Sequence, residues 1–323
     1  MMRLLSAFLF LPAMAAAQDR PVLTAMTYDS FVTEWGPGPE LERSFEATCG
    51  CDLRFVAPGD AAAMLSRLRL EGPRSEVDVI IGLDTNLMGA ARESGLFTTL
   101  EGMPATDLPV EWTDSTFLPF DWGWFGFVMN RNMPIPASMA ELADSDLRVV
   151  IQDPRSSTPG LGLVMWMKAA YGDQAGAMWE RLADNILTVT PGWSEAYGLF
   201  TEGEADAVLS YTSSPAYHIL AEGNSSKVAP IFTEGHYLQV EVAAKLAGSD
   251  QPDLADDFLR FLLSDEAQKV IATTNWMYPA REVDLPEAFA GLPRPEKTLF
   301  LPPDQVEDLR DAAIDEWQAA LSR

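Results

Sequence analysis

The chain has 323 residues, 47% of them hydrophobic, and 48 acidic side chains against 22 Lys and Arg give a formal net charge of −26. This length allows one large domain or two ordinary ones. So acidic a surface argues against nucleic-acid binding, because phosphates would be repelled. It is compatible with a cationic ligand, although solubility alone also explains it.

The first residues, MMRLLSAFLFLPAMAAA, place the positive Arg3 before an apolar centre and a small-residue end. This pattern predicts a secretory signal peptide over residues 1–17 with an Ala-x-Ala cleavage site. No Cys follows the predicted cut, so no lipid anchor is expected, and no later apolar run has the length of a membrane span. We therefore expect an exported, soluble chain.

Strand and helix patterns alternate after this leader. We expect strands at 21–28, 52–58 and 77–84, with helices at 38–48 and 60–72 between them. Such alternation predicts a largely parallel sheet covered by helices.

The only cysteines, Cys49 and Cys51, fall between the first helix and the second strand. An oxidising compartment allows a Cys-Gly-Cys disulfide, although one intervening residue makes the ring small. A structural disulfide and free buried thiols both remain open. A redox role is less favoured without a Cys-x-x-Cys motif, and the distant His218 and His236 do not give a zinc-site spacing.

The aromatic run FLPFDWGWFGFVMNRN has no helical period and is expected to be extended. After it the alternation resumes, with strands expected at 147–154, 185–192 and 206–211 and helices at 159–172, 194–204 and 215–223. The extended segment 237–246 lies where the chain would return to the first part.

These patterns predict two α/β lobes joined by extended crossovers. Lobe 1 is expected to comprise 18–120 plus 235–323, and lobe 2 to comprise 121–234. Small ligands bind such sheets in a cleft at the carboxyl ends of the strands. The last helix, 306–322, is expected to pack on a lobe through one apolar face.

Two segments, IQDPRSSTPGLG and LSYTSSPAY, each end a strand with hydroxyls, place Pro in the first helical turn and begin a helix. Free backbone N–H groups and the positive end of the helix dipole favour anions there. The hydroxyls predicted to hold phosphate or carboxylate oxygens are Ser157, Thr158, Thr212, Ser213 and Ser214. The alternative is that Thr158 and Ser214 only cap their helices.

Several aromatic residues lie in or beside Gly- and Pro-containing loops rather than at regular core spacing: Trp35, Trp193, Tyr217 and Trp276. Aromatic faces in a cleft would hold a flat or cationic group, although large aromatics also anchor loops. Asp60, Asp84 and Glu241 are candidates to supply negative charge or accept from an amino group. Helix capping explains Asp60 equally well.

Enzyme signatures are absent: there is no Gly-x-Ser-x-Gly, no Gly-x-x-x-x-Gly-Lys and no His-Glu-x-x-His. We therefore expect a protein that is not an enzyme. A hydrolase triad of Ser213 or Ser214 with His218 is the alternative, and a helix cap beside an ordinary histidine explains the short offset better.

A set of motifs occurs in the order found in one family: TYDSF with EWGPGP, LRLEG, VDVIIGLD, QDPRSSTPGLG, GWSEAYGLF, SYTSSPAYHIL, GHYLQVEVA and NWMYP. Over essentially the whole mature length the chain resembles the periplasmic thiamine-binding proteins of bacterial ABC importers. The resemblance implies a two-lobed type II binding-protein fold and a periplasmic location. It also implies thiamine, thiamine monophosphate or thiamine diphosphate as ligand, and an inner-membrane permease with its ATPase as partner. We expect a monomer with no cofactor and no metal.

The resemblance also implies ligand contacts. It places Asp60 and Ala61 where the family has Asp-Gly, so a methyl group replaces that glycine. It carries over the hydroxyl pair and the tryptophan as Ser157, Thr158 and Trp193, and a Tyr-Thr-Thr-Ser run as Tyr211, Thr212, Ser213 and Ser214. It associates the ring pocket with Tyr28, Trp35, Tyr217 and Trp276.

The implied mechanism has hydroxyls and helix N-termini accepting the phosphate or hydroxyethyl end while aromatic faces enclose the two rings. Lobe closure would then bury the ligand and present the form that a permease recognises. The rivals are a receptor for another organic cation such as a polyamine, an exported phosphate-ester hydrolase and, least favoured, a ferric-ion receptor.

Overall fold

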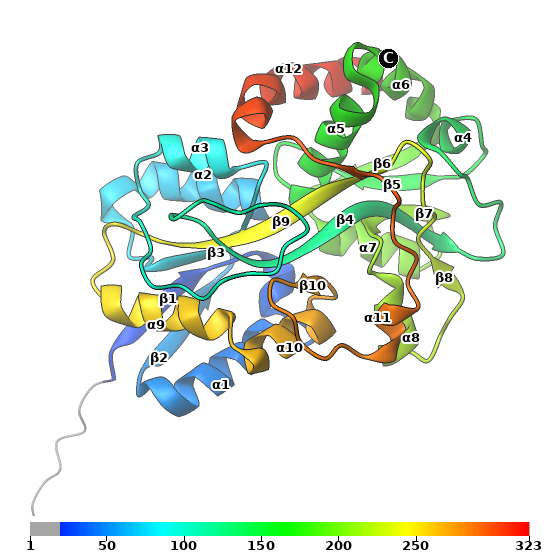
Figure 1. Cartoon of the computed structure of the whole chain (residues 1–323). Helices are drawn as coiled ribbons and strands as arrows, with labels where there is room; N and C mark the ends of the chain where they lie inside the picture. The colour runs from blue at the N-terminus through cyan, green and yellow to red at the C-terminus, as the bar shows by residue number, and fades with distance from the viewer. Residues whose placement is uncertain (1–19, 323) are drawn as a thin grey trace, which may run out of the picture.

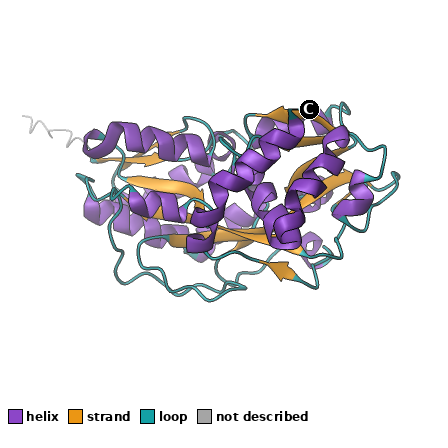
Figure 2. Cartoon of the chain, turned by 90° about the horizontal axis from the view of Figure 1, so that it is seen from above, coloured by secondary structure: helices purple, strands orange, loops and turns teal. Residues whose placement is uncertain are grey.

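The computed structural model describes residues 20–322, so the predicted signal peptide 1–17 lies outside the described residues. Two α/β lobes lie side by side, and the long strands β4 (Leu118–Asn130) and β9 (His236–Lys245) run through both (Figure 1). Seen from above, the molecule is elongated and its strands lie between helices (Figure 2). The predicted two-lobed fold is confirmed.

Lobe 1 is built on β1 (Val22–Met26), which pairs in parallel with β2 (Asp52–Val56) and β3 (Val79–Asp84). Its helices are α1 (Gly38–Cys49), α2 (Ala61–Glu71), α3 (Met88–Glu93), α9 (Pro252–Leu262) and α10 (Asp265–Thr274). Helix α9 was not predicted from the sequence, although its buried Ala255, Phe258, Leu259 and Leu262 follow helical spacing.

Lobe 2 repeats the design with β5 (Val149–Gln152) in parallel between β6 (Ile186–Thr190) and β7 (Ala207–Tyr211). Its helices are α4 (Met139–Ala143), α5 (Thr158–Tyr171), α6 (Ala175–Leu182), α7 (Trp193–Thr201) and α8 (Pro215–Ala221). Each of the strands β5, β6 and β7 is followed by a helix, as the alternation predicted.

The connecting strands make the sheet mixed rather than largely parallel. Leu118–Trp124 of β4 pair antiparallel with β9, and Phe125–Met129 pair antiparallel with β7. β9 is also antiparallel to β3, which gives the order β2-β1-β3-β9-β4-β7-β5-β6. The parallel pairs are β1 with β2 and β3 in lobe 1, β5 with β6 and β7 in lobe 2, and the short β11 (Thr298–Leu299) with β9.

The remaining elements are short: η1 (Asp29–Val32), η2 (Gly72–Arg74), η3 (Gly172–Gln174), η4 (Ala183–Asn185), β8 (Lys227–Val228), β10 (Tyr278–Pro279), α11 (Glu287–Ala290) and β11 (Thr298–Leu299). The last helix, α12 (Pro303–Leu321), buries Val306, Ala313 and Trp317 and packs on α5 and α6 of lobe 2 as well as on α3 of lobe 1. The exact lobe limits, 18–120 plus 235–323 and 121–234, therefore stay a prediction.

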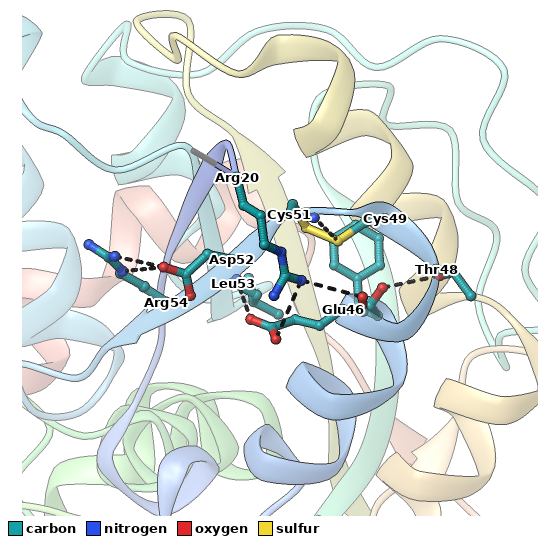
Figure 3. Close-up of polar contacts among 9 residues, drawn as sticks. Arg20, Glu46, Thr48, Cys49, Cys51, Asp52, Leu53 and Arg54 are labelled. Atoms are coloured by element: carbon teal, nitrogen blue, oxygen red, sulfur yellow. Dashed lines mark hydrogen bonds and ion pairs between the residues drawn. A yellow bond between two sulfur atoms is a disulfide. The ribbon is translucent and has the colours of Figure 1, made fainter. Parts of the chain in front are cut away.

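Cys49 and Cys51 form a disulfide in the turn between α1 and β2 (Figure 3). Gly50 between them has φ 66°, a left-handed conformation that glycine adopts without a Cβ penalty. The backbone N–H of Cys51 also donates to Cys49 Sγ at 3.0 Å. Of the two alternatives left open by the sequence, the structure has the disulfide.

Among the helices of residues 20–322, none combines the length and the apolar composition that a membrane span requires.

Candidate functional site

A cavity of about 480 Å³ lies between the lobes, within the size range of small-molecule sites. Lobe 1 contributes the segment after β1, the start of α2, Glu241 of β9 and the turn from α10 to β10. Lobe 2 contributes the first turns of α5, α7 and α8 and the end of β7. This is the place that two lobes with parallel strands predict, since the carboxyl ends of the strands face the cleft.

The cavity brings together many of the residues singled out in the sequence. On its wall are Tyr28, Trp35, Asp60, Thr158, Trp193, Tyr211, Ser214, Tyr217 and Trp276. Off its wall are Ala61, Ser157, Thr212 and Ser213. Thr212 and Ser213 are fully buried, and the Oγ of Ser213 has no hydrogen-bond partner among the described residues. Their ligand contacts stay a prediction.

An aromatic wall, formed by Trp35, Trp193, Tyr197, Tyr217 and Trp276, crosses the cleft. The Trp193 ring stacks on Tyr197 with centroids 4.7 Å apart, and Trp35 of lobe 1 lies 6.2 Å from Trp193. Tyr217 meets Trp276 edge to face at 5.5 Å. Large aromatics from both lobes therefore line one space, as the loop tryptophans suggested.

Tyr197 was not singled out in the sequence, yet it lines the cavity. It lies four residues after Trp193 on α7, which places both rings on one helix face. Asn275 and Met277 were missed in the same way beside Trp276. Trp276 itself has φ 58°, a conformation that a bulky residue rarely adopts and that clusters at functional sites.

Both histidines are fully engaged away from serine. Tyr197 OH lies 2.8 Å from His218 Nε2, and His218 Nδ1 lies 2.7 Å from Glu222 Oε2. Because the carboxylate accepts the Nδ1 proton, Nε2 accepts from Tyr197. His236 Nε2 accepts from the backbone N–H of Phe232, and Nδ1 donates to the carbonyl of Phe125, each at 2.7 Å. The alternative triad of Ser213 or Ser214 with His218 therefore lacks its nucleophile–base contact.

The hydroxyls of Ser157 and Ser214 are hydrogen-bonded within the protein rather than capping their helices. Ser157 is the N-cap of α5 and Ser214 that of α8, and neither side chain makes a cap hydrogen bond. Ser214 Oγ instead lies 2.8 Å from Ser210 Oγ and accepts from the Tyr211 N–H at 3.2 Å. The capping alternative is therefore wrong for Ser214, and Thr158 is the first helical residue rather than the cap.

Asp60 links the lobes across the cleft. It precedes α2, makes no side-chain cap hydrogen bond to that helix, and accepts from Ser157 Oγ of lobe 2 at 2.7 Å. Burial raises the pKa of Asp60 to about 6, against the lowering effect of hydrogen bonds from Ser157 and the backbone N–H of Trp193. The carboxyl group of lobe 1 thus sits at the N-termini of α5 and α7, where an anionic ligand group was expected.

A second acidic feature, which we call the carboxylate row, consists of Asp84, Glu241 and Asp121. The register pairs Glu241 of β9 with Asp84 of β3 on one side and Asp121 of β4 on the other. Directly paired residues project from the same face, so the three carboxyl groups lie side by side across three strands. Asp84 and Asp121 have no exposed surface, and Glu241, 5% exposed, lines the cavity.

The carboxylate row is held by neutral groups. Tyr28 OH donates to Glu241 Oε2 at 3.0 Å, and Asn275 Nδ2 donates to Asp121 Oδ2 at 2.8 Å. Burial raises the pKa of Asp84 to about 7 and that of Asp121 above its usual range. Burial and the neighbouring Asp121 raise the pKa of Glu241 well above its usual range. Asp121 was not predicted, because its position opposite Glu241 depends on a strand pairing between distant segments.

Comparison with known proteins agrees with this architecture. Residues 40–274 match the family model described as bacterial extracellular solute-binding protein. The chain is 52% identical over 309 residues to the thiamine-binding periplasmic protein of Escherichia coli K12, covering 94% of each. It is 51% identical to that of Salmonella typhimurium, covering 98% of each. The chain belongs to the thiamine-binding periplasmic proteins of this family. The resemblance drawn from the motifs is therefore confirmed.

A solved structure gives the same assignment. A periplasmic thiamin binding protein superposes with a TM-score of 0.92 at 52% identity, covering 94% of this chain and 97% of that one. A ferric binding protein from Campylobacter jejuni has a TM-score of 0.74 at 19% identity, covering 92% and 99%. The second likeness shows the fold alone. Within residues 20–322, no group of three or more His, Cys, Asp and Glu side chains is arranged to hold a metal ion.

Proposed function

We propose that this chain is the periplasmic receptor that captures thiamine and delivers it to an inner-membrane ABC importer. The observation that carries the proposal is an interlobe cavity lined both by aromatic rings from the two lobes and by the buried carboxyl groups of Asp60 and Glu241. Such a site suits a flat, permanently cationic ligand. The 52% identity to the Escherichia coli thiamine-binding protein supports the same ligand.

The aromatic wall encloses the two rings of thiamine. Trp193, stacked on Tyr197, supplies one pair of rings, and Tyr217 with Trp276 supplies a second pair on the cavity wall. A cation over an aromatic ring gains about 0.5 to 2 kcal/mol, so several ring contacts give strong binding. Because these residues come from both lobes, the ligand favours the closed arrangement, and a permease recognises that arrangement.

We propose that thiamine monophosphate and diphosphate are also ligands, with the phosphate at the helix starts of lobe 2. Thr158 of α5, Ser194 of α7 and Ser214 before α8 all line the cavity. The first N–H groups of a helix attract anions. Asp60 lies at the same place, so an ionised Asp60 carboxylate would repel a bound phosphate.

We further propose that the protein acts as a monomer and catalyses no reaction on its ligand. Support for the second point comes from the engaged ring nitrogens of His218 and His236. Without a histidine beside Ser213 or Ser214, neither serine has a general base to activate it.

Calorimetric titration of the unfolded, refolded and ligand-free protein tests the function. The titrants are thiamine, its two phosphates, putrescine and inorganic phosphate. Submicromolar binding confined to the thiamine series is expected. Equal or tighter binding of putrescine would favour the polyamine rival, and release of inorganic phosphate from an added ester would favour the hydrolase.

A further inference from the structure

Within the part of the chain that the structure describes, the carboxylate row has no positive partner. None of the ion pairs formed by residues 20–322 involves Asp84, Asp121 or Glu241. Asp121 Oδ1 is buried and has no hydrogen-bond partner in this part of the chain. Burying adjacent carboxylates without a cation is strongly unfavourable, so their charge must be removed by protons or balanced by a ligand.

The groups that face Glu241 from the packed elements reinforce this conclusion. They are Asp84 on β3, Asp121 on β4, Tyr28 after β1, Asp60 before α2, Tyr211 at the end of β7 and the amides of Gln239 and Asn275. Each is acidic or neutral. Glu241 is the member of the row that reaches the cavity wall, and it is therefore the contact point for a positive group inside the cavity.

Building on the proposed function, we propose that the carboxylate row exchanges protons for the ligand cation. The empty receptor holds protons on the row, and entry of the thiamine cation releases about one of them to solvent. The O–H bond of one carboxyl group breaks, its proton goes to the buffer, and the carboxylate balances the quaternary nitrogen. Glu241 is thereby the residue that selects a cationic ring over a neutral ring of the same shape.

This exchange has a distinct signature. Deprotonation must accompany cation binding, so affinity for thiamine rises by up to about tenfold per pH unit between about pH 6 and pH 8. A neutral isostere, in which carbon replaces the quaternary nitrogen of thiamine, gains nothing from deprotonation. Its affinity is expected to stay flat or fall over the same range.

The test is calorimetry with thiamine and the neutral isostere in two buffers of different ionisation enthalpy, which together count the protons released. Wild type, Glu241→Gln and the control Asp311→Asn are compared; Asp311 is an exposed acid on α12. Wild type and control should release a proton with thiamine only. Glu241→Gln should lower thiamine affinity about tenfold or more, leave the isostere unchanged and reduce the release.

The opposite results are equally clear. Thiamine binding by wild type without proton release, or equal losses for both ligands in Glu241→Gln, would overturn the proposal and leave the row a structural feature. The wild-type proton count decides the question even where the variant does not fold. If the wild-type protein binds neither ligand, the proposed function is overturned, and this inference is overturned with it.

Discussion

The two lobes present different chemistry to the same cavity. Lobe 1 presents the carboxyl group of Glu241, which the sheet register fixes between the buried Asp84 and Asp121. Lobe 2 presents the ring of Trp193 and the first turns of α5, α7 and α8. A strand ladder holds charge at a defined place, whereas helix starts offer N–H groups to an anion. The difference suggests that the cationic ring points to lobe 1 and the phosphate end to lobe 2.

Acidity should stabilise the ligand-free lobe 1. A carboxyl group whose pKa is higher in the folded state adds stability that is full below its unfolded pKa and is lost as pH rises through its folded value. For Asp84 that window runs from 3.8 to about 7. About three pKa units correspond to about 4 kcal/mol. The melting temperature of the ligand-free protein should therefore fall between about pH 4 and pH 7.

Asp84→Asn should flatten that pH dependence because it removes the titrating carboxyl group, while the exposed Asp311→Asn should keep it. A wild-type melting temperature that rises steadily over the same range would show that the row is ionised in the empty receptor.

Gly82→Ala should disturb lobe 1 through Tyr28. Gly82 has φ 95°, and a Cβ there would lie 2.3 Å from the Tyr28 ring, which carries the hydroxyl bonded to Glu241. We expect a loss of about 3 kcal/mol in the free energy of unfolding, from strain plus overpacking. The matched control is Gly203→Ala, with φ 84° and open space around it, for which about 1 kcal/mol is expected. Equal losses in urea denaturation would mean that the ring approach adds nothing.

Trp193→Ala should weaken the binding of the thiamine rings by lobe 2. All thiamine forms carry the same rings, so each should lose about ten- to thirtyfold in affinity. Trp193→Phe keeps an aromatic face but loses the Nε1 donation to Ser210 Oγ at 2.9 Å, and it should lose less. A Trp193→Ala effect confined to the phosphate esters would show that the ring lies elsewhere.

Ser157→Ala combined with Ser214→Ala should produce the smallest effect. We expect about three- to tenfold weaker binding of the phosphate esters and a smaller change for thiamine. Ser156→Ala is the control, since Ser156 Oγ donates to the Pro191 carbonyl and does not line the cavity. Equal losses for all forms in the double variant would remove the phosphate assignment.

Local patterns predicted the alternating elements well, because hydrophobic periodicity and Gly or Pro breaks act within a few residues. Helix α5 and strand β7 lie close to their expected bounds for that reason. The mixed pairing of β4 and β9 depends on where distant segments meet, which no local pattern contains. The contact of α12 with both lobes has the same origin.

The site residues show the same difference between features that depend on local sequence and features that depend on contacts between distant segments. Trp193 and Tyr217 were accessible from the sequence because they lie in or beside loops rather than at regular core spacing, and Tyr211 was implied by the family resemblance. Asp121 and the bond between Asp60 and Ser157 were not, since each joins residues that come together only in the assembled lobes. The hydroxyls of Ser157 and Ser214 were identified, but their internal partners were not.

The most direct test of the account is a crystal structure of the refolded protein with thiamine bound. We predict that the quaternary nitrogen lies within about 5 Å of the Glu241 carboxylate, the distance at which an opposite charge acts strongly, and that Trp193 packs against a ring of the ligand. A thiazolium ring turned toward the helix starts of lobe 2, with the hydroxyethyl group at Glu241, would contradict it.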